Sequence, residues 1–124
     1  MDLSLDVPQN HLFIRSMDKR GIRVADEYYV SPFILSAQQI IPAWQAESLD
    51  EINASSLRPI FEMQPEVVLI GCGKTQAFLP PAIQMLFFRR DIGLEVMTTG
   101  AACRTFNVLA SEGRQVVAAL LPEI

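Results

Sequence analysis

The sequence predicts a single-domain α/β fold in which an N-terminal β-meander is followed by a β-α-β-α-β unit. Two patterns carry this prediction. Short apolar runs between polar turns fill the first third of the chain, and strand-sized apolar runs then alternate with helix-length amphipathic segments. With 124 residues, 50% of them hydrophobic, the chain can bury one core without disulfides, and we expect residues 1–124 to form one domain.

Four short apolar runs are the expected strands of the meander: residues 12–14, 22–24, 28–30 and 33–35. A polar turn ending at Gly21 joins the first two runs as a hairpin. The third run, which contains Tyr28 and Tyr29, either continues the second strand or opens a third one. Residues 38–44 are apolar, but Pro42 predicts an edge strand or a bulge there, because proline cannot donate to a sheet ladder.

A change of composition near residue 48 predicts the first helix. Three N-cap candidates compete for its start: Ser48 with Glu51 as a capping box, Asn53, and Ser55 or Ser56. Pro59 favours a start at Ser55 or Ser56, because proline is tolerated in the first turn of a helix. The helix is expected to end near Met63. Its predicted buried stripe is Leu57, Ile60 and Phe61.

The second half of the chain alternates cleanly between strands and helices. Expected strands cover residues 67–70, 94–97 and 115–121, and expected helices cover residues 80–90 and 101–112. The first of these strands is wholly apolar, which is typical of a parallel strand covered on both faces. Gly93 ends the first helix, and Gly113 ends the second as its C′ residue. Such β-α-β connections predict right-handed crossovers and largely parallel strands.

The charge balance limits the classes of partner. The chain carries 14 acidic and 10 basic residues, a net charge of −4, which argues against nucleic-acid binding. Lys19 and Arg20 with Arg23, and the pair Arg89 and Arg90, are interpreted as a solvated turn and a helix end. Residues 1–9 lack the basic start and apolar block of a signal peptide, and no apolar run has the length of a membrane span. We therefore expect a cytoplasmic protein.

The cysteine and histidine content argues against metal and cysteine chemistry. Cys72 and Cys103 form no C-x-x-C pair and predict two free thiols in a reducing compartment. His11 is the only histidine, so there is no Cys/His metal set and no base near at hand for a nucleophile. Cys103 falls in the first turn of its predicted helix, where a thiolate is favoured, although a buried apolar role is the preferred interpretation. We expect no metal, no cofactor and no catalytic residue, and we favour a protein that is not an enzyme.

The turn at residues 71–73 is the first candidate ligand site. Residues 73–75 copy the end of a Walker A loop, but Val68 stands where that motif needs its first glycine. The dinucleotide-binding fingerprint fails as well, because Gln76 replaces its third glycine. The preferred interpretation is that Gly71 and Gly73 supply backbone angles that other residues cannot adopt.

The second candidate site is the segment 98–107, which joins a strand to a helix N-terminus. Free N–H groups and small residues there would admit an anion, and Arg104 would offer a fork of donors. Both segments follow parallel-type strands, so they share the carboxyl edge of the sheet, and Cys72 and Cys103 are close if these strands are neighbours. The plainer interpretation is that Thr98 or Thr99 caps the helix and that Arg104 is solvated. The candidate ligand-binding residues are Gly71, Cys72, Gly73, Thr98, Thr99, Gly100, Cys103, Arg104 and Asn107.

Two blocks resemble one family across nearly the whole chain: EVVLIGCG with FLPP at residues 66–81, and GLEVMTTGAACRTFNVL with EGR at residues 93–114. The chain is similar to the domain of unknown function 498 family, which includes stand-alone bacterial and archaeal proteins, a mitochondrial assembly factor for respiratory complex I and an animal protein linked to adipocyte differentiation. The resemblance implies a three-layer fold around a mixed sheet, no established catalysis, and protein association.

Particular residues carry the resemblance further. Gly71, Gly73, Thr99, Ala102, Thr105 and Asn107 fit the family pattern. Cys72 stands where the family usually has Thr, and Thr98 where it often has Asp. Asn107 is a mediocre helix former in mid-helix, so a specific hydrogen bond explains it best. That bond either ties the helix to the Gly71 loop, which we favour, or faces a ligand.

Two functions follow from these observations. The first is a non-catalytic interaction or assembly module with an unidentified protein partner, which predicts an exposed apolar patch built from Tyr28, Tyr29 or Trp44. The second is a binding protein for a small anionic ligand, or an unrecognised enzyme, with its site at residues 71–73 and 98–107. Nucleic-acid binding is not expected.

Overall fold

The computed structural model describes residues 1–3 and 10–123. The meander consists of β1 (Ile14–Asp18), β2 (Gly21–Val24), β3 (Glu27–Tyr29), β4 (Phe33–Ser36) and β5 (Ile40–Ile41). The remaining elements, after a 3-10 turn at Leu49–Glu51, are α1 (Ala54–Glu62), β6 (Val67–Gly71), α2 (Pro81–Phe88), β7 (Gly93–Met97), α3 (Thr99–Ser111) and β8 (Val116–Leu120). This order confirms the predicted meander followed by β-α-β-α-β. Residues 4–9, most of the segment judged to lack a signal peptide, lie outside the described residues.

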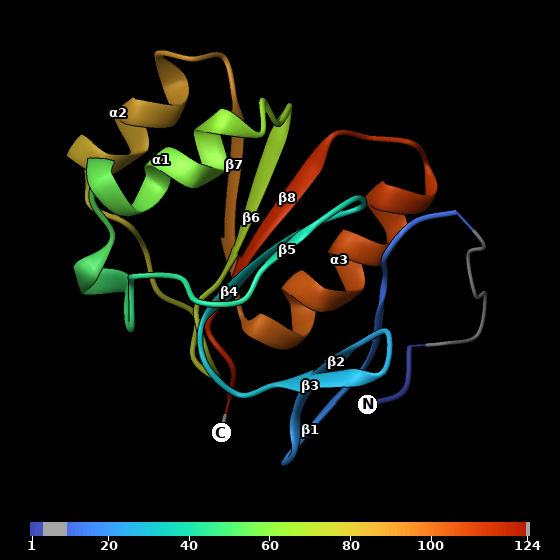
Figure 1. Cartoon of the computed structure of the whole chain (residues 1–124). Coiled ribbons are helices and arrows are strands. Elements are labelled where there is room, and N and C mark those ends of the chain that lie inside the picture. The colour runs from blue at the N-terminus through green and yellow to red at the C-terminus, as the bar shows by residue number, and fades with distance from the viewer. Residues whose placement is uncertain (4–9, 124) are drawn as a thin grey trace.

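The strands form two sheets. A five-stranded sheet has the order β5-β4-β8-β6-β7, and a three-stranded antiparallel sheet has the order β1-β2-β3. β6 pairs in parallel with β7 and β8, whereas β4 pairs antiparallel with β8, so the larger sheet is mixed, as predicted. Figure 1 shows α1 and α2 on one side of this sheet and α3 on the other, with the three-stranded sheet next to α3. These are the layers that the family resemblance implied.

Alternation along the central strands builds a core on each face of the large sheet. Val67 and Leu69 of β6 face α3 and the three-stranded sheet, while Val68 and Ile70 face α1 and α2. All five residues of β6 are buried. Because neighbouring side chains of a strand point to opposite faces, only a continuous apolar run supplies both cores at once.

The meander differs from the prediction in its details. The first strand begins at Ile14 rather than residue 12 and continues to Asp18, which pairs with Gly21. The loop is therefore only two residues long, and it is stabilised by the Asp18 carboxylate, which accepts the Arg20 N–H at 2.8 Å. Residues 27–29 form a third strand, and the strand before Pro42 is an edge strand, so one of the two alternatives held open at each place is confirmed.

The start of α1 corrects two predictions. Asn53 is the N-cap: its side chain accepts the Ser56 N–H at 3.0 Å, and Ser56 Oγ accepts the Asn53 N–H at 3.0 Å. This reciprocal capping box fixes the start at Ala54, whereas Ser48 makes no side-chain cap bond. Pro59 consequently lies in the second turn of the helix, not in the first, and it removes the N–H that would bond to Ser55.

The C-terminal helix also begins earlier than predicted, at Thr99 rather than residue 101. Thr98 is its N-cap and accepts the Ala101 N–H at 3.4 Å. Gly113 follows the helix with φ at 78°, which confirms its role as the C′ residue. Gly100 is therefore helical, and Cys103 lies beyond the first turn.

Replacing Pro59 with alanine restores a donor for the Ser55 carbonyl and removes a ring from the helix interior. We expect Pro59→Ala to raise the free energy of unfolding by about 1 kcal/mol, since the cost of an interior proline exceeds the entropy that it removes from the unfolded chain. Urea unfolding followed by circular dichroism measures the change. Arg58→Ala, at the exposed neighbouring position, is the control and should stay within about 0.5 kcal/mol of the parent.

Candidate functional site

The two candidate segments meet at one edge of the large sheet because β6 and β7 are adjacent parallel strands. The Cys72 N–H donates to the Met97 carbonyl at 2.8 Å, directly after both strands end. One residue further on, the Thr99 N–H donates to the Gly73 carbonyl at 2.9 Å, and the Gly73 N–H donates to Thr99 Oγ1 at 2.8 Å. The glycine turn and the start of α3 are thus joined by reciprocal hydrogen bonds.

The Thr99 hydroxyl is the centre of this junction. It accepts the Gly73 N–H and donates to the Leu121 carbonyl at 2.6 Å, and the residue is fully buried. Leu121 follows β8, so one side chain ties together the ends of β6 and β8 and the first turn of α3. A buried hydroxyl with both a donor and an acceptor partner is a fully satisfied group.

Gly71 and Gly73 meet different structural requirements, a close approach at Gly71 and a positive φ at Gly73. A Cβ on Gly71 would lie 2.9 Å from Leu120 Cδ2 and 3.0 Å from Thr99 Cα, so glycine there permits the close approach of α3. Gly73 has φ at +97°, a conformation that L side chains rarely adopt, and a Cβ there would meet nothing within 4 Å. The interpretation from backbone angles is confirmed for Gly73 and is wrong for Gly71.

Most backbone donors of the predicted anion site already have partners inside the protein. Cys72, Gly73 and Thr99 donate as described, and the N–H groups of Ala101 and Ala102 donate to the side chain and the carbonyl of Thr98. A ligand at this edge would have to replace these bonds. The edge in its present form is a structural junction, and its use as a ligand site stays a prediction.

The two cysteines are free, but they differ in environment. Cys103 is fully buried in the core beneath α3, and burial raises the pKa of its thiol to about 12, with the charge of Glu123 adding to the rise and that of Arg104 opposing it. The expectation that a helix N-terminus favours its thiolate is therefore wrong. Cys72 is half-buried, and its thiol donates to the Thr75 carbonyl at 3.3 Å.

Arg104 and Asn107 have hydrogen-bonding partners outside the glycine loop. Arg104 is exposed and its Nη1 lies 3.1 Å from Met1 Sδ. Asn107 Oδ1 accepts the Ile14 N–H at 2.8 Å, and Asn107 Nδ2 donates to the Ile14 carbonyl at 2.8 Å. The preferred structural role is correct, but the expected partner is wrong: Asn107 lies two helical turns beyond Thr99 and ties α3 to β1, the first strand of the smaller sheet.

The aromatic residues suggested as interface anchors are used elsewhere. Trp44 is 4% exposed and its Nε1 donates to the Ser56 carbonyl at 2.8 Å. Tyr29 stacks on Phe33 with 4.8 Å between ring centroids, and Tyr28 lies under the guanidinium groups of Arg20 and Arg23. The predicted location of the apolar patch is therefore wrong.

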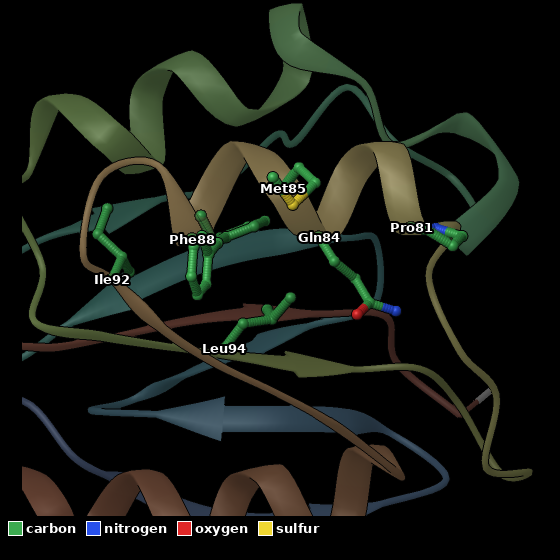
Figure 2. Close-up of a pocket in the computed structure, with 7 residues that line it drawn as sticks. Pro81, Gln84, Met85, Phe88, Ile92 and Leu94 are labelled. Carbon is green, nitrogen blue, oxygen red and sulfur yellow. The ribbon is translucent and has the colours of Figure 1, made fainter.

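An exposed apolar groove lies instead between α2 and β7 (Figure 2), with a volume of about 330 Å³. It is lined by Pro81, Gln84, Met85, Phe87, Phe88, Ile92 and Leu94. Phe88 is 75% exposed and Met85 is 42% exposed. The signal in the sequence is the pair Phe87 and Phe88, since adjacent helical residues cannot both face the core; Phe87 is the buried one.

The fold defines the class of protein. It is a three-layer α/β domain in which a mixed five-stranded sheet separates two helices from a third helix and a small antiparallel sheet. None of the helices formed by residues 1–3 and 10–123 is long and apolar enough to cross a bilayer.

The chain belongs to the family described as "Protein of unknown function (DUF498/DUF598)", which matches residues 14–121. It is 32% identical over 122 residues to NADH dehydrogenase [ubiquinone] 1 alpha subcomplex assembly factor 3 of Mus musculus, an alignment that covers 97% of the chain and 65% of that relative. It is 33% identical over 89 residues to the 13 kDa major membrane protein of Francisella tularensis, covering 71% of the chain and 72% of that protein. The solution structure of a Xanthomonas campestris protein matches with a TM-score of 0.83 and 34% identity, over 98% of the chain and 92% of that protein.

These relationships confirm the family that the sequence resembles and the fold that it implies. The chain spans less than two thirds of the length of the mouse assembly factor. The assembly role in the name of the mouse relative is that protein's own.

Removing the Thr99 hydroxyl should destabilise the junction. Thr99→Val keeps the shape of the side chain but leaves the Gly73 N–H and the Leu121 carbonyl without partners, so we expect a loss of about 2 to 4 kcal/mol in the free energy of unfolding. Thr99→Ser keeps the hydroxyl and loses one methyl group, for about 1 kcal/mol. Chemical denaturation of both variants checks the order, and an equal loss in both would show that the hydroxyl is not the important group.

The thiols should react selectively. In the native protein a thiol reagent at pH 8 is expected to label Cys72 and to spare Cys103, whose buried thiol stays protonated and inaccessible. The unfolded chain titrates Cys103 near its usual value of 9.0, so stability should fall as the pH rises from about 9 towards 12. Mass spectrometry of Cys72→Ser should show no native labelling and one label after denaturation. Rapid native labelling of that variant would contradict the assignment.

Proposed function

We propose that this chain is a non-catalytic assembly module that binds a protein partner through the groove between α2 and β7. The observation that supports the proposal is the exposure of Phe88 and Met85, one turn apart on α2, beside the half-buried Ile92 and Leu94. Figure 2 shows Phe88 and Leu94 in the space between the helix and the strand. An apolar surface of this kind, continuous with the core beneath it, is typical of an interaction site.

The energetic case rests on Phe88. An aromatic side chain exposed to three quarters of its surface gains about 2 kcal/mol when a partner covers it. Met85 adds a flexible side chain that adapts to the shape of a partner. Gln84 gives the groove a polar wall, with its Nε2 held by the Leu79 carbonyl at 2.7 Å. The groove thus combines an aromatic anchor with an adaptable neighbour and an oriented amide, and aromatic residues and methionine are enriched at protein interfaces.

The partner is expected to pack an element such as a helix into the groove, and not to add a strand to the edge of the sheet at β7. β7 is an edge strand, but its Val96 carbonyl accepts the Gln76 side-chain amide at 2.8 Å. Glu95, in the middle of the strand, is exposed and places a charge on the edge. Both features oppose pairing with another strand. Packing into the groove needs neither backbone group.

The family relationship supports assembly as the purpose of this association, since the mouse relative is named as an assembly factor. We also infer that residues 1–124 act as one domain, because the two cores share the five-stranded sheet. A cytoplasmic location is supported by the two free thiols, which suit a reducing compartment. The name of the Francisella relative, a major membrane protein, is compatible with a partner that is held at a membrane.

A charge placed in the groove should abolish the association without unfolding the protein. We expect Phe88→Asp to reduce the recovery of a specific co-purifying protein at least about tenfold, because the loss of the anchor and the burial of a carboxylate together exceed 1.4 kcal/mol. Val108→Asp is the matched control, since Val108 is 54% exposed on α3, across the sheet. The measurement is quantitative mass spectrometry after affinity purification at native expression levels.

The two variants separate the groove from general surface effects. Both should keep the circular dichroism spectrum and melting temperature of the parent, since both positions are exposed. Equal loss of the partner in both variants, or undiminished recovery with Phe88→Asp, would contradict a binding site in the groove.

A further inference from the structure

The outer face of the small sheet carries a second pocket, far from the groove in both sequence and fold. Its volume is about 280 Å³, and it is lined by Met1, Asp2, Arg15, Ser16, Asp18, Arg20, Arg23 and Tyr28. Figure 1 shows this sheet next to α3, on the other side of the large sheet from α2. Three guanidinium groups therefore lie around this pocket, together with the carboxylates of Asp2 and Asp18.

Strand register explains how these residues meet. Ser16 pairs with Arg23, and Arg23 pairs with Tyr28, so the three side chains form a row across β1, β2 and β3. The neighbouring row, Met17, Ile22 and Tyr29, packs on the opposite face into the core beneath α3. An irregularity in β1 between Ile14 and Ser16 brings Arg15 to the rim of the same pocket. The two-residue turn adds Arg20.

The arginines of the pocket are not equally engaged. Arg20 is paired with Asp18, with 2.9 Å between Arg20 Nη2 and Asp18 Oδ2, and this hydrogen bond lowers the pKa of the Asp18 carboxyl. Arg15 and Arg23 share a single carboxylate oxygen of Asp26, at 3.8 Å and 3.6 Å. The Asp26 side chain is 89% exposed, and ion pairs of this length on an exposed carboxylate are weak.

A second observation, besides the weak ion pairs with Asp26, indicates a ligand at this pocket: the state of the Arg23 Nε atom. This atom is buried and has no hydrogen-bond partner within residues 1–3 and 10–123. The guanidinium of Arg23 lies 5.8 Å from the centroid of Tyr28, and that of Arg20 lies 4.8 Å from the same ring, so the aromatic face helps to orient both groups. Buried donors without an acceptor are rare in folded proteins, so this one, in a pocket lined by three guanidinium groups, indicates a place for a further acceptor.

We propose that this pocket binds a small molecule through an oxyanion, a carboxylate or a phosphate group, held by the guanidinium groups of Arg15 and Arg23. The incoming oxyanion competes for the two guanidinium groups with the Asp26 carboxylate, which pairs with both of them but does not line the pocket. Guanidinium groups suit this ligand because their planar forks match two oxygens at once. The site is independent of the groove beside α2, and neither depends on the other.

Because Asp26 competes with the ligand, the proposal predicts that substitutions of Arg23 and of Asp26 change the affinity in opposite directions. Titrations with inorganic phosphate and with succinate, followed by calorimetry and by the side-chain Nε–Hε signal of Arg23 in NMR spectra, separate the two kinds of oxyanion. Arg23→Gln should weaken binding about tenfold or more, as expected for a charged hydrogen bond. Asp26→Asn should instead strengthen it, by up to about fivefold, because it removes a weak competing ion pair.

Two control variants change the same net charge outside the pocket. Lys19→Gln removes a cation from the exposed turn, and Glu27→Gln removes an anion beside Asp26; neither residue lines the pocket, and both are exposed. Each should alter the affinity by less than about twofold. All variants should keep the amide NMR spectrum of a folded chain.

The affinities of the four variants and the NMR signal of Arg23 together test the proposed oxyanion site. Binding of phosphate or succinate that falls with Arg23→Gln, rises with Asp26→Asn and shifts the Arg23 Nε–Hε signal supports the site and shows which oxyanion it prefers. Equal changes in affinity with Arg23→Gln and Lys19→Gln, or with Asp26→Asn and Glu27→Gln, would overturn the proposal. They would show that the affinity depends only on the net charge of the protein. Binding of an acidic peptide by a protein that binds neither small oxyanion would also overturn the proposal.

Discussion

The hydroxyl of Thr99 joins the end of β6, the end of β8 and the first turn of α3. A parallel β-α-β-α-β unit brings the ends of several strands to the carboxyl edge of its sheet. The residues after each strand carry backbone groups that no longer pair within the sheet. Thr99 Oγ1 receives the Gly73 N–H and gives its own hydrogen to the Leu121 carbonyl. Gly71 makes this possible, since any Cβ there would push the first turn of α3 away from the sheet.

That arrangement determines what the edge can do. In many open α/β sheets the same place binds a ligand, because backbone N–H groups of loops and helix ends stay available there. In this chain the donors of residues 72, 73 and 99 already bond within the protein. The groove beside α2 and the arginine pocket on the small sheet carry exposed apolar and charged side chains, so they are better places to look for recognition.

The sequence was sufficient for the fold and much less so for the sites. Periodicity identified the strands and helices because each obeys a local rule, as the five buried residues of β6 and the cap at Thr98 illustrate. It misplaced the start of α1, because the choice among Asn53, Ser55 and Ser56 depends on a reciprocal bond that only coordinates reveal. Asn107 was correctly singled out as a residue with a specific bond, but its partner, Ile14, lies 93 residues away in the chain.

The arginine pocket shows why sites of this kind cannot be predicted from the sequence alone. Arg15, Arg20 and Arg23 are scattered over nine residues, and by spacing alone they resemble the solvated charges of a turn. Their convergence depends on an irregularity in β1 and on a register that pairs Arg23 with both Ser16 and Tyr28. Neither is a local property of the sequence. The same register places Ile22 in the core, so a shift by one residue would bury the arginine and expose the isoleucine. The core that fixes the small sheet on α3 therefore also holds Arg23 in the pocket.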